Sequence, residues 1–135
     1  MKLLKCSVCG KVVLVMDNEN NTDTICCGKP MEEVQIKEKD EGTEKHTPYV
    51  KIKNGCAFVK IGSIIHPSEE NHYIKAIALC FEDGFYVKQL SSKDVPEIVI
   101  PIGCHKNLKA AYCYCNIHGG WKCAKDCFIE CRKKS

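Results

Sequence analysis

Residues 72–90 read HYIKAIALCFEDGFYVKQL, and the pattern of this stretch decides the fold class. Two runs rich in β-branched and aromatic residues, 72–81 and 85–90, are separated by a short turn that ends at Gly84. Runs of this length that are bounded by Gly and Asp are typical of β-strands. No long stretch of the chain repeats at the helical period of 3.6 residues. The stretch therefore predicts two strands of an all-β domain.

The same pattern continues on both sides of this stretch. Short β-rich runs occur at residues 49–52, 57–61, 98–102 and 111–115, and Gly and Pro residues separate them. Several short strands at intervals of about 8–12 residues favour a β-sandwich or a β-barrel. We therefore predict a β-rich domain over residues 44–122.

The chain before this domain has a different composition. Residues 1–36 contain four cysteines in two pairs, and the apolar run at residues 12–15 between the pairs predicts a strand. Residues 37–43 read KEKDEGT, which is charged and has no apolar periodicity, so we interpret them as a linker. Residues 123–135 form a cysteine-rich basic tail.

Composition and charge limit the classes of function. The 135 residues are 44% hydrophobic and 27% charged, which is usual for a globular protein. Lys and Arg number 20 and Asp and Glu number 17, which gives a net charge of +3. The last fifteen residues carry five bases and two acids, so the remainder carries 15 of each and is neutral. A neutral body lacks the basic face of a nucleic-acid-binding protein, and we expect no nucleic-acid partner.

Twelve cysteines in 135 residues indicate disulfides, bound metal or both. The chain begins MKLLK, where Lys5 interrupts the apolar run that a secretory signal needs. No stretch approaches the roughly 20 apolar residues of a membrane span. We therefore expect a cytoplasmic protein without a membrane partner, in which thiols stay reduced. Cysteines at ligand spacing then favour metal over disulfides.

The four cysteines of the first segment have the spacing of a metal site. The two-residue gap between Cys6 and Cys9 lets both sulfurs face one ion, and Gly10 suits the tight turn that follows. Cys26 and Cys27 are adjacent, so they can share an ion only if the backbone bends between them. Four thiolates leave no open position, which favours structure or electron transfer over substrate chemistry. The spacing leaves zinc and iron open, and two unrelated reduced pairs are the alternative.

Four histidines and one cysteine of the second segment form another candidate set. They are His46, His66, His72, Cys115 and His118. Each histidine taken alone is a weak indication, and so is a single C-x-x-H motif. Together the five side chains would suit an ion that keeps one position open, whereas structural zinc prefers four ligands.

Two residues near these candidates have open interpretations. In a strand, Cys113 would lie on the same face as Cys115, so it is either close to a bound metal or a small core residue. Trp121 would either shield the metal or anchor the core.

These motifs resemble those of the desulfoferrodoxin family, the two-iron superoxide reductases of anaerobes. The resemblance runs from about residue 3 to residue 122, nearly the whole chain. It rests on several motifs in the same order, which are CSVCG at 6–10, CCGKPM at 26–31, EKHTP at 44–48, HPSEENHYI at 66–74 and CNIHGGWK at 115–122.

The resemblance implies a small desulforedoxin-like β module, then an immunoglobulin-like β-sandwich, and two mononuclear iron centres. The ligands of the first iron would be Cys6, Cys9, Cys26 and Cys27. The ligands of the second would be His46, His66, His72 and His118 in a plane, with Cys115 axial. Glu44 would bind the open position of the ferric form, and Lys45 would attract the anionic substrate.

The resemblance also implies the reaction, a one-electron reduction of superoxide to hydrogen peroxide that detoxifies oxygen species in an anaerobe. It implies a rubredoxin-like electron donor and a homodimer. The main alternative is a rubredoxin-like electron-transfer protein without substrate chemistry, and a structural zinc protein is a third class. Neither of these requires the charged pair Glu44 and Lys45 beside a ligand.

The tail departs from the family pattern, which ends shortly after Trp121 and Lys122. Cys123, Cys127 and Cys131 recur every four residues and would form one stripe on a helix, with the outer two about 12 Å apart. All three could bind one ion only if the helix opened. We therefore interpret the segment as an exposed, reduced tail, and a third metal or redox role is the alternative.

Overall fold

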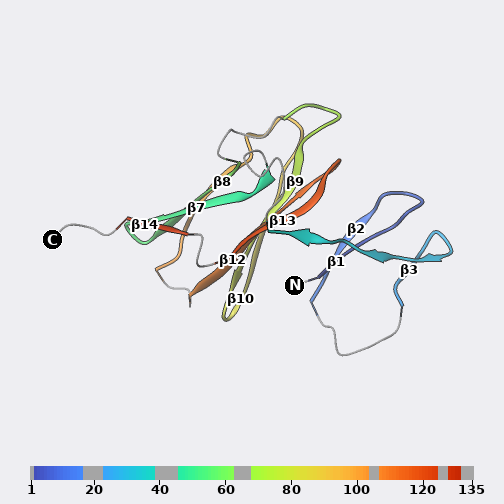
Figure 1. Cartoon of the computed structure of the whole chain (residues 1–135), viewed down its shortest axis with the longest axis horizontal. Coiled ribbons are helices and arrows are strands. Elements are labelled where there is room, and N and C mark those ends of the chain that lie inside the picture. The colour runs from blue at the N-terminus through green and yellow to red at the C-terminus, as the bar shows by residue number, and fades with distance from the viewer. Residues whose placement is uncertain are drawn as a thin grey trace. The chain divides into compact units, whose positions relative to one another are not determined.

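A computed structural model describes residues 2–16, 23–38, 46–62, 68–103, 107–124 and 128–131. The chain divides into two compact units, Met1–Gln35 and Ile36–Ser135. Every element with described bounds is a β-strand, and these strands number fourteen (Figure 1). The all-β class predicted from the sequence is confirmed. Among the described residues, no helix is long and apolar enough to cross a membrane.

The first unit contains a three-stranded antiparallel sheet in the order β2-β1-β5 and a two-stranded sheet of β3 and β4. The bounds are β1 Lys2–Lys5, β2 Val12–Val15, β3 Ile25–Cys26, β4 Lys29–Pro30 and β5 Glu32–Glu33. Among its described side chains, the buried apolar ones are Leu4 and Cys6. A unit this short with so small a core needs a cross-link or a bound metal to be stable.

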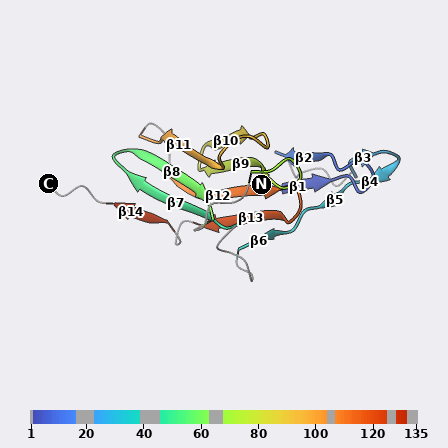
Figure 2. The same cartoon turned by 90° about the horizontal axis from the view of Figure 1, so that it is seen from above.

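The second unit contains two sheets, in the orders β10-β9-β12-β13-β6 and β11-β8-β7-β14 (Figure 2). The bounds are β6 Ile36–Lys37, β7 Pro48–Lys53, β8 Cys56–Ile61, β9 Ile74–Phe81, β10 Gly84–Gln89, β11 Glu97–Pro101, β12 Leu108–Cys115, β13 Gly119–Ala124 and β14 Ile129–Cys131. Neighbouring strands are antiparallel except for the pairs β13–β6 and β14–β7, which are parallel. The two eight-residue strands, β9 and β12, are thus interior strands of the first of these sheets.

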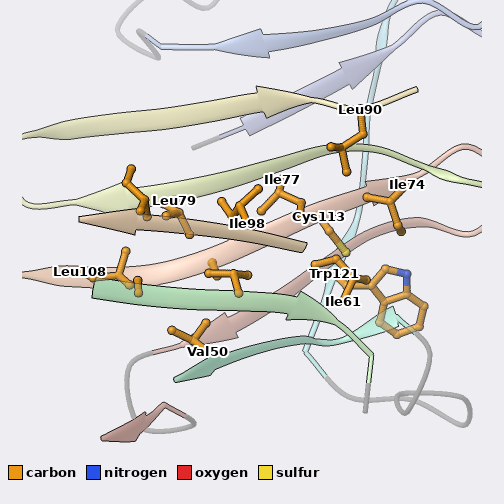
Figure 3. Packing of buried hydrophobic residues seen from close by; sticks show 14 of the residues in the cluster. Val50, Ile61, Ile74, Ile77, Leu79, Leu90, Ile98, Leu108, Cys113 and Trp121 are labelled. Carbon is orange, nitrogen blue, oxygen red and sulfur yellow. The ribbon is translucent and has the colours of Figure 1, made fainter. Parts of the chain in front are cut away.

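The core of the second unit lies between its two sheets. In β8, Ala57, Val59 and Ile61 are buried, and the residues between them point outward, as the two-residue period of a strand requires. Ile77 and Leu79 of the other sheet are also fully buried. Figure 3 shows the labelled side chains of both sheets pointing into the shared space. The unit is therefore a β-sandwich, which is one of the two architectures that the strand pattern favoured and the one that the family resemblance implied.

The C-terminal segment differs from the expected exposed tail. Cys123 lies in β13, opposite Ala111 of β12, and its exposed fraction is only 3%. Phe128 packs against the core, and β14 pairs in parallel with β7. Backbone pairing with existing strands therefore replaces the helical stripe considered for the tail cysteines, while Cys127 lies outside the described residues.

Candidate metal centres

Four cysteine sulfurs meet in the first unit. The Sγ atoms of Cys6, Cys9, Cys26 and Cys27 all lie within 4.8 Å of one another, and none forms a disulfide. The sulfurs of Cys9 and Cys26 are 3.8 Å apart, and those of Cys26 and Cys27 are 3.9 Å apart. Four thiolates bound tetrahedrally at about 2.3 Å from one ion lie about 3.8 Å apart. The sulfur spacing therefore fits a single metal ion with four thiolate ligands.

The loop after β1 prepares Cys6 for this role. Gly10 has a φ of +79°, and its N–H donates a hydrogen bond to the Cys6 carbonyl at 3.0 Å. This turn directs the N–H groups of Cys9 and Val8 at the Cys6 sulfur, each at 3.4 Å. These two donors lower the pKa of Cys6 to about 6, because they stabilise the thiolate. The tight turn predicted at Gly10 is thus confirmed.

The adjacent cysteines lie at a sharp bend between β3 and β4. Cys27 has a φ of +51° and Gly28 a φ of +75°, so the backbone turns through the left-handed region as the shared-ion hypothesis required. Interaction with the Cys6 and Cys9 sulfurs raises the pKa of Cys26 to about 12. Four thiolates therefore need a cation beside them, and metal binding would displace the remaining protons.

Three imidazoles and one thiol meet in the second unit. The donor atoms of His46, His72, Cys115 and His118 all lie within 4.8 Å of one another. His46 Nε2 is 3.0 Å from His118 Nδ1, and Cys115 Sγ is 3.7 Å from the same nitrogen. A distance of 3.0 Å is typical of a hydrogen bond between the two nitrogens. Two nitrogens that each lie about 2.1 Å from one metal ion, at right angles, are separated by the same distance. The donor set therefore fits a metal ion.

This cluster is buried on one side and open on the other. Cys115 is 0% exposed and His46 is 7% exposed, whereas His72 is half-buried and His118 is exposed. The described part of the cluster is therefore buried at Cys115 and His46 and reaches the surface at His118.

The remaining predicted site residues are Glu44, Lys45 and His66, and all three lie outside the described residues. Of the predicted five-ligand set, the structure brings together the thiol and three of the four imidazoles.

Trp121 and Cys113 both support His46. The indole ring of Trp121 stacks on the His46 ring, with centroids 4.9 Å apart and planes at 17°. The Cys113 thiol donates a hydrogen bond to the His46 carbonyl at 3.1 Å, and burial raises the pKa of this thiol well above its usual value, which keeps the donor protonated. Both residues belong to the core cluster, and Figure 3 shows them close together. The two interpretations open for each residue are therefore compatible, since each is a core residue that also contacts the site.

Asn116, which the sequence analysis did not single out, joins two parts of the cluster. Its Oδ1 accepts a hydrogen bond from the Tyr73 N–H, and its Nδ2 donates to the Asn71 carbonyl, each at 3.0 Å. Its own N–H donates to the Tyr73 carbonyl at 3.2 Å. The turn that follows Cys115 is thus fastened to both neighbours of His72. The sequence offered only a weak signal, the tendency of Asn in turns to bond backbone groups.

Lys37 is the second residue that the sequence analysis missed. Its Nζ donates a hydrogen bond to the His118 carbonyl at 3.1 Å and lies 4.8 Å from the centre of the Trp121 ring. Composition placed Lys37 at the start of a charged segment, whereas in the structure it belongs to β6.

Comparison with known proteins agrees with this geometry. The family described as desulfoferrodoxin matches residues 38–124. A desulfoferrodoxin homolog from Archaeoglobus fulgidus is 38% identical over 122 residues, which cover 90% of this chain and 95% of that protein. The desulfoferrodoxin of Nitratidesulfovibrio vulgaris is 38% identical over 122 residues, covering 90% and 94%. The crystal structure of the superoxide reductase from Treponema pallidum matches with a TM-score of 0.77 and 26% identity, and covers 90% of this chain and 96% of that chain.

Proposed function

Because the chain belongs to the desulfoferrodoxin family, we propose that it is a superoxide reductase with two mononuclear iron centres. The observation that carries the proposal is the cluster of three imidazoles and one thiol in the sandwich unit, which is open to solvent at His118. Four thiolates form a closed site, so the cysteine cluster of the first unit offers no position for a substrate. Substrate chemistry therefore belongs to the histidine cluster.

An iron ion at this cluster would supply the electron that reduces superoxide. Its ligands would be His46, His72, His118 and Cys115, with His66 as the fourth imidazole. Conversion of one superoxide to hydrogen peroxide takes up one electron and two protons, and solvent at the His118 side supplies the protons.

The chain controls the charge and the access at this site. Neutral imidazoles add no charge and Cys115 adds one negative charge, so a divalent ion there retains a positive charge that attracts an anion. Cys115 lies fully inside the sandwich, where water does not compete for its sulfur. Trp121 and Cys113 fix the ring and the backbone of His46, which orients that donor.

The charged residues that precede His46 take separate roles in this proposal. Lys45 would attract the superoxide anion, and Glu44 would offer a carboxylate ligand to the oxidised ion. Both assignments follow from the match of EKHTP at residues 44–48 to the family motif.

The four-cysteine centre of the first unit would then either supply electrons or stabilise that unit. The proposal also includes a rubredoxin-like protein as the electron donor, a homodimeric state, a cytoplasmic location and a role in detoxification. They are supported by the family membership.

Metal analysis together with pulse radiolysis tests the proposal. The purified protein should contain two irons per chain, absorb visible light when oxidised, and in its reduced form consume superoxide while releasing hydrogen peroxide. A colourless zinc protein would refute it. An iron protein that passes electrons to an acceptor but leaves superoxide decay at its uncatalysed rate would instead favour the electron-transfer alternative.

A further inference from the structure

Lys37 lies beside the histidine cluster because of an unusual strand pairing. The two-residue strand β6 pairs in parallel with β13, with Ile36 opposite Gly120 and Lys37 opposite Trp121 (Figure 2). Residues that are directly opposite in a sheet present their side chains on the same face. The pairing therefore sets the lysine next to the indole ring that stacks on His46.

Two contacts hold the ammonium group in place. It donates a hydrogen bond to the His118 carbonyl at 3.1 Å, and it lies over the Trp121 ring at 4.8 Å, within the range of a cation–π interaction. The acid that follows it, Glu38, has its carboxylate 3.5 Å from the Nζ of Lys122. The acid nearest in sequence is thus engaged by a different base, while the Lys37 ammonium keeps its contacts with the His118 carbonyl and the Trp121 ring.

We propose that Lys37 is a fixed positive charge that raises the local concentration of the anionic substrate at the histidine cluster. The inference rests on the proposed function, and the residue acts through its field rather than by contact with the reacting atoms. This proposed role of Lys37 is separate from the role proposed for Lys45, which directly precedes His46 in the sequence.

The size of the effect follows from the distance. The carbonyl oxygen and ring of one histidine lie within about 6 Å of each other, so the ammonium, at 3.1 Å from the His118 carbonyl, lies within about 9 Å of the ring nitrogens of His118. Attraction between unit charges at about 9 Å changes a local concentration by about twofold in water and about twentyfold at an effective dielectric constant of about 20. Since the Debye length at 0.1 M salt is about 10 Å, we expect a two- to fivefold effect at low ionic strength.

The placement of Lys37 is tested by fluorescence, because Trp121 is the only tryptophan of the chain. In the full-length, zinc-substituted protein, Lys37→Met should shift the Trp121 emission maximum. Lys122→Met is the matched control, because Lys122 pairs with Glu38, lies 5.9 Å from the Tyr112 ring and points to the other face of β13. Equal spectra for Lys37→Met and the wild type would overturn the placement.

The electrostatic role is tested on the iron-loaded protein with azide, a stable monoanion. In spectral titrations, Lys37→Met should weaken azide binding two- to fivefold at low salt, and the rate with superoxide should fall by a similar factor. Lys37→Arg, which keeps the charge, and Lys122→Met should both stay within twofold of the wild type. The inference would be overturned if Lys37→Arg lost as much azide affinity as Lys37→Met. It would also be overturned if Lys37→Met bound azide as tightly as the wild type. A wild type that does not react with superoxide would refute the proposed function instead.

Discussion

Asn116 binds no metal, yet its substitution by Ala should lower both the stability of the second unit and the metal affinity of the histidine cluster. The change removes two hydrogen bonds of 3.0 Å, from the Tyr73 N–H and to the Asn71 carbonyl. Each bond contributes about 1 kcal/mol net, and the half-buried Tyr73 N–H loses a partner, so we expect the free energy of unfolding to fall by about 2–3 kcal/mol. Because these bonds flank His72, metal affinity at this centre should fall by about tenfold.

The stability loss is measurable by urea unfolding followed through Trp121 emission, since this single tryptophan reports the second unit alone. Metal affinity is measured by chelator competition, and the four-cysteine centre should keep its ion.

Two control variants separate the hydrogen bonds from a general effect of substitution. Asn71→Ala keeps the backbone carbonyl that accepts from Asn116, so it should cost less than about 0.5 kcal/mol. Asn116→Asp keeps the acceptor for Tyr73 and loses the donor, so it should cost about half as much as Asn116→Ala. If Asn116→Ala unfolds within about 0.5 kcal/mol of the wild type, or if Asn71→Ala costs as much, the reasoning is wrong.

Three further predictions concern other parts of the chain. Cys9→Ser should remove one of two irons yet keep the direct reaction with superoxide in pulse radiolysis; a large fall in rate with the second iron still bound would contradict this. The Ser91 N–H donates a hydrogen bond to the Asp94 carboxylate at 2.7 Å and lowers the pKa of that carboxyl. Asp94→Asn should therefore be less stable than the wild type above about pH 4, and this difference should disappear as the pH falls lower. Urea unfolding of both proteins at about pH 6 and about pH 3 measures the difference. Truncation after Ala124 should leave both metals bound but lower the melting temperature, because Phe128 and β14 leave the sandwich; loss of a metal equivalent would indicate a third site.

The strands that the sequence predicted are those whose local pattern agrees with their burial. The run at residues 12–15 coincides with β2, and the runs at 49–52 and 57–61 fall within β7 and β8. In β7 and β8 the β-branched residues that favour strands, Val50, Val59 and Ile61, are also buried in the core. Local preference and tertiary packing therefore indicate the same structure.

The elements that escaped prediction depend on partners far along the chain. β13 begins with two glycines, which weaken any local strand signal, and it is held between β12 and β6. β6 has only two residues within a charged segment and exists through its pairing with β13. No local pattern of residues 36–37 could show this.

The same distinction applies to the site. Cysteine spacing predicted the sulfur cluster because the ligands are close in sequence and one turn joins each pair. The residues alone grouped the histidine set only as a candidate, and the family resemblance assigned its members as ligands, since residues 46 and 118 meet only after the sandwich has formed. The side chains of Asn116 and Lys37 form hydrogen bonds with backbone groups that lie 43 or more positions away in the sequence. Composition and spacing do not encode such bonds.

The short strand β14 has a consequence for how this protein behaves in a crowded solution. Without it, β7 would be the border of its sheet, and those of its N–H and C=O groups that do not pair with β8 would be unpaired. Such an open border is a template on which strands of other molecules can add, and proteins commonly protect it. Here the chain covers half of β7 with its own last described residues, opposite Lys51, Ile52 and Lys53. The C-terminal extension thus guards against self-association into larger aggregates, and its loss would first be visible in light scattering at high protein concentration.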